Sequence, residues 1–294
     1  MLKSSDIEAV VRPIIFQEYI TESLDAFPAS IINDNMREFN FILGFATDTY
    51  LEDGTGTGAF TRSWSFDDFS PTKVLNLKQE HKNVKVVISI GGHGTEDVFN
   101  PYDKEEWIKN AKSSIKDLLL DYKIESMPVS FYTIDGIDIN YENIKSNADD
   151  FADCIGKVIK QLKEDHEVLN SVNVVSIAPT KDLQPHYRTL YLKNQDNIDW
   201  INYKFYNHTF DSEKEFVKLF KILVYEYGTA FKLLPGISTN TNTPSSMTTD
   251  IFVKGCTILL KTASLPGVFV WDANTSSSPT YSLEEELQKL LTKE

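Results

Sequence analysis

The stretch Asp135-Gly136-Ile137-Asp138-Ile139-Asn140-Tyr141-Glu142 alternates polar and apolar side chains. Alternate residues of a β-strand face the same side, so one face carries Asp138, Asn140 and Glu142, and the other carries apolar groups. Burying an unpaired charge costs several kcal/mol, about 3–5 for a broken buried pair, so such a polar row usually serves a site. We interpret residues 134–142 as a buried strand with a functional polar face that ends at Glu142.

Similar short runs recur along the whole chain, each seven to nine residues long and most of them rich in Val, Ile, Phe or Tyr. These compositions are typical of strands. Between the runs, apolar residues recur at spacings of three and four, which predicts helices. The other expected strands are 13–20, 39–46, 85–92, 172–179, 200–207, 232–239 and 267–273, and the clearest expected helices are 104–120, 147–165, 212–227 and 282–293.

Eight strands that alternate with helices predict an α/β protein with a single (β/α)₈ TIM barrel. We expect one domain over residues 1–294, with the barrel at about 12–292. An open doubly wound sheet is the alternative. It would usually place a glycine-rich turn after its first strand, and the sequence EYITESLDAF there contains no glycine.

The charge balance bears on possible partners. The chain has 29 Lys and Arg against 43 Asp and Glu, which gives a net charge of −14. Such an acidic protein binds polyanions poorly, so we expect neither nucleic acid nor a membrane as a partner. The first 20 residues contain Asp6, Glu8 and Arg12, which interrupt any signal-peptide core, and Cys154 and Cys256 look like free thiols. We therefore expect a cytosolic protein.

Other motifs suggest little chemistry. The glycine-rich stretch 52–60 lacks the Lys-Ser/Thr of a phosphate-binding loop, so we interpret it as a flexible loop. It belongs to the long segment 47–70, which in a barrel would rise over the C-terminal mouth. None of the five histidines has a partner at metal-ligand spacing. We expect no metal and no cofactor.

The strand at 135–142 resembles the D-G-x-D-x-D-x-E signature of family 18 glycoside hydrolases, the chitinases, and keeps four of its five fixed positions. Residues 89–92 resemble the S-x-G-G motif of that family. The resemblance is closer still to the narbonin and RuBisCO-associated group of legume proteins, which have the chitinase fold but are not known for hydrolysis. It implies vestigial catalytic positions at Glu142, Asp138, Asn140 and Tyr206, and binding positions at Trp271, Ser89, Gly91, Asn207 and Lys204.

In family 18, the resemblance implies, the Glu protonates the glycosidic oxygen and the acetamido group of the sugar attacks C1. The Asp two residues before the Glu orients that group and stabilises its positive charge. Asn140 replaces this Asp, and an uncharged amide cannot balance the charge. It also removes a negative charge that would favour the protonated form of Glu142. Of the acidic residues, we interpret only Asp135, Asp138 and Glu142 as functionally placed.

Lys204 is a second departure. Alternation along 200–207 points Lys204 into the barrel, where active relatives commonly have a neutral polar residue. A buried Lys needs a partner, so our hypothesis is that Lys204 pairs with Asp138 or Glu142. An ion pair would hold Glu142 as a carboxylate. The alternative is that Lys204 extends to the mouth and contacts neither carboxylate.

These observations predict a cytosolic, chitinase-like protein without effective hydrolase activity. Its role would be storage, or association with a protein or sugar. One alternative is a weak or specialised N-acetylglucosaminide hydrolase that uses Glu142 as its acid. Another is a lectin that binds chito-oligosaccharide through Trp271, Tyr206 and Asp138.

Overall fold

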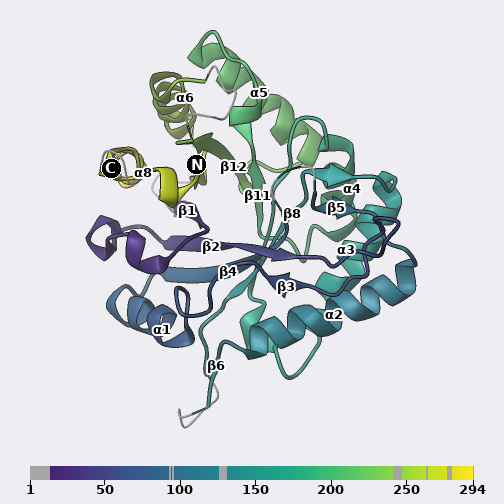
Figure 1. The fold of residues 1–294 in the computed structure, drawn as a ribbon. Helices are drawn as coiled ribbons and strands as arrows, with labels where there is room; N and C mark the ends of the chain where they lie inside the picture. The colour runs from purple at the N-terminus through teal and green to yellow at the C-terminus, as the bar shows by residue number, and fades with distance from the viewer. Residues whose placement is uncertain are drawn as a thin grey trace, which may run out of the picture.

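The chain folds into a closed parallel barrel of eight strands surrounded by helices (Figure 1). The computed structural model describes residues 14–92, 94, 96–125, 131–240, 247–262, 264–276 and 280–293. Strand β1 pairs with both β2 and β13, which closes the sheet and confirms the predicted TIM barrel over the open alternative. The barrel strands are β1 (Ile15–Ile20), β2 (Glu38–Thr47), β4 (Val84–Gly91), β8 (Gly136–Asn140), β10 (Val174–Ile177), β11 (Trp200–Tyr203), β12 (Leu233–Ser238) and β13 (Gly267–Trp271).

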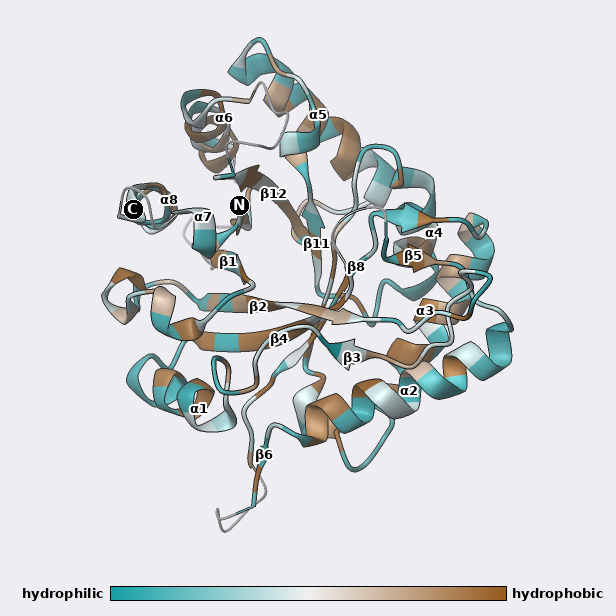
Figure 2. Cartoon of the chain, viewed as in Figure 1, coloured by the Kyte–Doolittle hydropathy of each residue, from teal (hydrophilic) through white to brown (hydrophobic). Residues whose placement is uncertain are grey.

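Helices cover the outside of the barrel. Figure 2 shows mainly hydrophobic strands inside an outer layer of helices that alternate hydrophilic and hydrophobic residues, as amphipathic helices do. The four expected helices are present. The described helices are α1 (Pro71–Glu80), α2 (Lys104–Leu120), α3 (Ala148–Lys163), α4 (Gln184–Asn194), α5 (Glu213–Tyr227), α6 (Thr249–Lys261), the short α7 (Ala273–Ser276) and α8 (Ser282–Leu291).

Several short elements decorate the connections. They were not expected, because runs of two or three residues carry no periodic signal. They are the strands β3 (Thr61–Arg62), β5 (Val98–Phe99), β6 (Lys123–Ile124), β7 (Phe131–Tyr132) and β9 (Asn143–Ile144), and the 3₁₀ turns η1 (Leu24–Ala26), η2 (Ala29–Ile31), η3 (Leu169–Ser171) and η4 (Phe205–Asn207).

The sixth barrel strand is shorter than predicted. Pairing of β11 with β12 ends at Tyr203, and the chain then turns at Lys204 into η4. The expected strand 200–207 is therefore wrong from residue 204 onward. The backbone N–H of Lys204 donates to the carbonyl of Pro179 at 3.0 Å, which holds this turn at the end of the barrel.

Strand β8 has the predicted two faces. Ile137 and Ile139 are buried toward the helices, and the next residue on that face, Tyr141, makes edge contacts with Phe99 and Phe151 at centroid distances of 5.3 and 6.3 Å. Asp138 and Asn140 are fully buried on the inner face. The strand therefore delivers its polar row to the inside of the barrel, as the alternation predicts.

The segment that was expected to rise over the mouth packs on helix α2. Asp48 accepts hydrogen bonds from the Gly58 N–H at 2.7 Å and from the Trp107 indole N–H at 2.8 Å. Asn110 and Ser114 on α2 bond to the backbone of residues 57–60. Residues 56–60 of the glycine-rich stretch thus pack against α2, whereas residues 52–54 are exposed. Burial raises the pKa of Asp48 to about 6.

Two glycines of this loop test how closely it packs. Both have positive φ, but a Cβ on Gly58 would lie 2.3 Å from the Trp107 carbonyl oxygen, whereas a Cβ on Gly54 would meet nothing within 4 Å. We expect Gly58→Ala to lower the free energy of unfolding by about 2–4 kcal/mol and Gly54→Ala by only about 1 kcal/mol. Urea unfolding of both variants measures the difference. Equal losses of unfolding free energy in the two variants would show that the loop at Gly58 shifts to accommodate the Cβ without strain.

No helix in the described part of the chain is both long and apolar enough to cross a membrane.

Candidate functional site

Asp138 lies at the centre of a hydrogen-bonded group inside the barrel. Its carboxylate accepts from the hydroxyls of Tyr19 at 2.9 Å, Ser89 at 2.7 Å and Ser176 at 2.6 Å. Ser89 and Ser176 come from β4 and β10, the two strands that pair with β8, and Tyr19 comes from β1 on another part of the barrel. Burial raises the pKa of Asp138 above its ordinary value, and the three hydroxyls lower it again. The group fixes Asp138 without a direct ion pair.

Lys204 joins the polar row above Asp138. Its ammonium group donates to the Asn140 side-chain oxygen at 2.7 Å and to a carboxylate oxygen of Glu142. Only 1% of the Lys204 side chain is exposed, so this ion pair is shielded from water on the lysine side. The hypothesis of a paired Lys204 is confirmed, and Glu142 is the partner rather than Asp138. The turn after β11 places the side chain there.

The amide orientation of Asn140 follows from this contact. An ammonium group only donates, so the oxygen of Asn140 faces Lys204 and its Nδ2 faces elsewhere. Nδ2 is buried and has no acceptor among the described residues. In this position an Asp would offer Lys204 a second carboxylate.

Glu142 lies just past the end of β8, at the mouth of the barrel, with 26% of its side chain exposed. Its second carboxylate oxygen accepts from the backbone N–H of Gly94 at 3.2 Å. Gly91, at the end of β4, is needed here because a Cβ would lie 2.5 Å from the Asn140 carbonyl oxygen. The close approach of β4 to β8 therefore brings the following loop to Glu142.

Tyr206 and Trp271 lie near this group. Burial raises the pKa of Tyr206 well above its usual value, and the charges of Glu142, Asp272 and Asp138 raise it further. The Trp271 ring is 8% exposed and packs against Tyr19 and Phe45, at centroid distances of 5.1 and 5.9 Å. Little of that ring is therefore open for stacking on a sugar.

Two predicted residues lie away from the group. Asn207 is exposed at the end of η4, where its backbone N–H donates to the Lys204 carbonyl at 3.1 Å. Asp135 precedes β8, at the opposite end of the strand from Glu142. It pairs with Lys78 at 2.8 Å and accepts from the Val86 N–H at 2.8 Å. Asp135 therefore anchors the base of the barrel, and the interpretation that it is functionally placed is wrong.

Sequence reasoning missed Tyr19 and Ser176, which complete the shell of Asp138. Each lies in a run that was recognised as a strand, at a position whose alternation points inward. That alternation is the signal that could have found them. It does not show which inward residues reach Asp138, because this depends on the stagger between strands.

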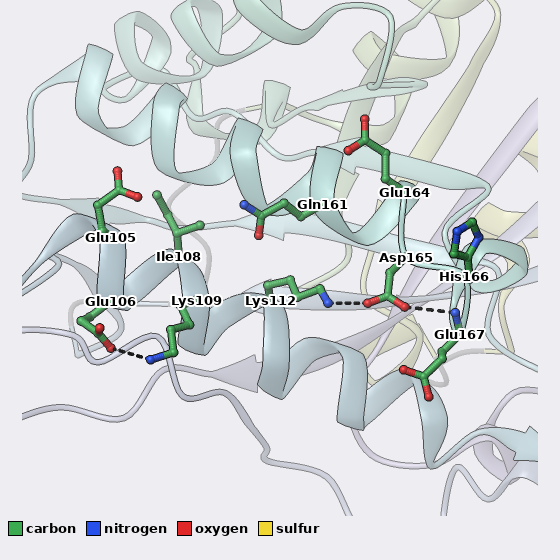
Figure 3. Close-up of a pocket in the computed structure, with 10 residues that line it drawn as sticks. All are labelled: Glu105, Glu106, Ile108, Lys109, Lys112, Gln161, Glu164, Asp165, His166 and Glu167. Carbon is green, nitrogen blue, oxygen red and sulfur yellow. Dashed lines mark hydrogen bonds and ion pairs between the residues drawn. The ribbon is translucent and has the colours of Figure 1, made fainter.

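A hollow of about 880 Å³ lies elsewhere, on the outer surface between α2 and α3 (Figure 3). It is lined largely by charged side chains that pair with one another, including Lys109 with Glu106 and Lys112 with Asp165. The hollow holds none of the predicted site residues. Among the described residues, no group of three or more His, Cys, Asp or Glu side chains could hold a metal ion.

Comparisons with known proteins agree with this geometry. Residues 40–251 match the family "Glycosyl hydrolases family 18". "Chitinase 1" from Tulipa saxatilis subsp. bakeri is 34% identical over 98% of this chain and 90% of its own length. "RuBisCO-associated protein" from Glycine max is 26% identical over 64% of this chain and 63% of its own. The catalytic domain of a family GH18 chitinase from the fern Peteris ryukyuensis superposes with a TM-score of 0.81 at 30% identity, covering 95% of this chain and all of that one.

Proposed function

The chain belongs to glycosyl hydrolase family 18, and we propose that within this family it is a chitinase-like protein without effective hydrolase activity. The observation that carries the proposal is the ammonium group of Lys204, which contacts both Asn140 and Glu142. Two consequences follow, one for the acid and one for the charge that the reaction develops.

The first consequence concerns proton donation. Glu142, the acid at the position of the family signature, must be protonated to release the leaving group. A buried ammonium in contact favours the charged carboxylate over the neutral acid. A general acid contributes about 10²–10⁴ in rate, so a Glu142 that is held ionised removes much of that acceleration.

The second consequence concerns the developing positive charge. In substrate-assisted hydrolysis the acetamido group becomes a cation, which the Asp of the signature balances. Here that position is the neutral Asn140, with an ammonium beside it. Losing one such electrostatic contact typically costs about 10²–10³ in rate.

We further propose a cytosolic role in storage or in association with a protein or sugar. The similarity to a RuBisCO-associated protein supports this part. Chito-oligosaccharide binding is the second candidate. It is favoured by the part-exposed Glu142 at the mouth, and opposed by the small exposed areas of Tyr206 and Trp271.

We expect the protein to release reducing sugar from chitotetraose no faster than its Glu142→Gln variant does. Both rates should lie within about 10-fold of the background, because the acid step is already lost. The assay compares the two proteins at equal concentration after circular dichroism confirms folding. Turnover that disappears in Glu142→Gln would contradict the proposal. Calorimetric titration with the same sugar distinguishes the roles: heat at millimolar ligand supports sugar binding, and its absence favours storage or protein association.

A further inference from the structure

The outer face of helix α5 carries a stripe of like charge. Lys214, Lys218, Lys221 and Tyr225 follow one another at spacings of four, three and four residues, which places them on one side of the helix. All four are exposed, Tyr225 to 89%, and Ile222 beside them to 44%. Together with Val217 they line a shallow hollow of about 480 Å³. We call the four stripe residues and Ile222 the α5 face.

The lysines of the α5 face have no ion-pair partner within the described part of the chain. Several lysines on other helices do, for example Lys104 with Asp150 and Lys157 with Glu105. Like charges at these spacings destabilise a helix by about 0.2–0.5 kcal/mol per pair. Among the described residues, the glutamates of the same helix, Glu213, Glu215 and Glu226, form no ion pair with these lysines, so three unpaired ammonium groups share one side of α5 in a chain of net charge −14.

The exposed apolar groups of the α5 face are also unnecessary for folding. The opposite side of α5 already supplies the core, where Phe216 and Phe220 are fully buried and Phe216 packs against Phe252 of α6 at 5.5 Å. Tyrosine is enriched among residues that dominate protein interfaces, and isolated cations next to an aromatic ring suit a partner that supplies carboxylates.

We propose that the α5 face docks an acidic protein partner, through a segment that presents carboxylates about one helical turn apart with an apolar side chain between them. Charge complementarity carries the choice of partner. The net charge of −14 opposes a nucleic acid or an anionic membrane, and three lysines release few counterions. A short acidic segment contacts the three lysines directly, and salt screens its repulsion by the negative charges of this chain that lie farther than about 8 Å away.

The test uses a synthetic, fluorescein-labelled helical peptide with Glu at spacings of four and three residues around a central Leu, titrated by anisotropy. We expect saturable binding at micromolar protein. The variant K214Q/K218Q/K221Q should bind at least 10-fold more weakly, and Tyr225→Ser should also lose about 10-fold. The matched control K82Q/K261Q/K293Q removes three exposed lysines elsewhere, so the net charge changes equally, and it should bind like the unmodified protein.

Three outcomes would overturn the proposal. One is the absence of saturable peptide binding at millimolar protein. Another is equal loss in the two triple variants, which would make the effect one of net charge alone. The third comes from sedimentation velocity: concentration-dependent oligomers that vanish in K214Q/K218Q/K221Q would assign the α5 face to a second copy of this chain.

Discussion

Glu18→Gln is expected to raise the free energy of unfolding by about 1–3 kcal/mol at pH 8 and to change it far less at pH 4.5. Glu18 lies on β1 with its side chain outside the barrel lumen, and Glu284 lies on α8. Both side chains are fully buried; neither carboxyl oxygen of Glu18 has a hydrogen-bond partner among the described residues, and at Glu284 the Ser276 hydroxyl opposes the effect of burial on the pKa only in part. Two such carboxyls cannot both ionise without a large desolvation penalty.

The direction of the pH effect follows from the two raised pKa values. Burial raises the pKa of Glu18 well above its ordinary value, and the charges of Glu284 and Asp272 raise it further. Burial also raises the pKa of Glu284. The folded state therefore keeps protons that the unfolded state has released above about pH 4.5. Stability then falls as pH rises through this window, by up to about 1.4 kcal/mol per pH unit for each group.

The groups that face the pair reinforce this direction. Asp272 contributes a further negative charge, and Tyr281, whose pKa is itself raised by burial and then by Glu18 and Glu284, contributes no positive one. No lysine or arginine in the described part of the chain forms an ion pair with either carboxyl. A glutamine at position 18 keeps the size of the side chain and removes its titration.

The measurement is urea unfolding at pH 4.5 and pH 8 for the unmodified protein and the variant. Many groups titrate between these pH values. The effect of the variant on the free energy of unfolding is therefore measured at each pH, and the change in that effect between the two pH values isolates Glu18. Glu286→Gln is the matched control, since Glu286 is exposed on the same helix as Glu284. A gain that is equal at both pH values, or one that the control reproduces, would show that Glu18 is not held protonated in the folded protein.

The eight barrel strands could be predicted because most of them are runs rich in apolar residues and buried on both faces, and such runs stand out from the helical spacing between them. The polar face of β8 was equally clear from the alternation of Asp138 and Asn140. Helices such as α4 gave weaker patterns, because Tyr187, Leu190 and Tyr191 are its only buried residues. The spacing of apolar residues in a run predicts which side of its strand or helix each side chain faces.

Contacts across the barrel could not be predicted in the same way. Whether Lys204 meets Asp138 or Glu142 depends on the turn after Tyr203, where the strand period no longer applies. The partnership of Glu18 with Glu284 joins residues more than 260 positions apart and reverses the usual expectation that glutamates lie at the surface. An acidic first turn of a helix is usually solvated, yet the first turn of α8 buries Glu284.

The double variant Asn140→Asp/Lys204→Gln is expected to hydrolyse chitotetraose at least about 10²-fold faster than the unmodified protein. Asp at 140 supplies the missing negative charge of the family signature. Gln at 204 removes the ammonium that contacts Glu142, while its neutral amide, one bond shorter, can still donate a hydrogen bond to the part-exposed carboxylate. The double variant then has both a Glu142 that can be protonated and a carboxylate at position 140 that can balance the acetamido cation.

Neither single variant should suffice, with gains of at most about 10-fold. With Asp at 140 alone, the ammonium lies between two carboxylates and holds both ionised. With Gln at 204 alone, Glu142 is released but Asn140 still cannot balance the acetamido cation. Because the two side chains share one hydrogen-bonded group, their effects are expected to be strongly non-additive.

Initial rates of reducing-sugar release, measured from pH 4 to pH 8, give the comparison. Lys78→Gln is the matched control, because it removes another part-buried lysine ion pair, that with Asp135, at the opposite end of the same strand. It should leave the rate of hydrolysis unchanged. Adding Glu142→Gln to the double variant should abolish the gain. A double variant that folds, binds the sugar by calorimetry and still shows no turnover would mean that the Lys204 ion pair is not the cause of the missing hydrolase activity.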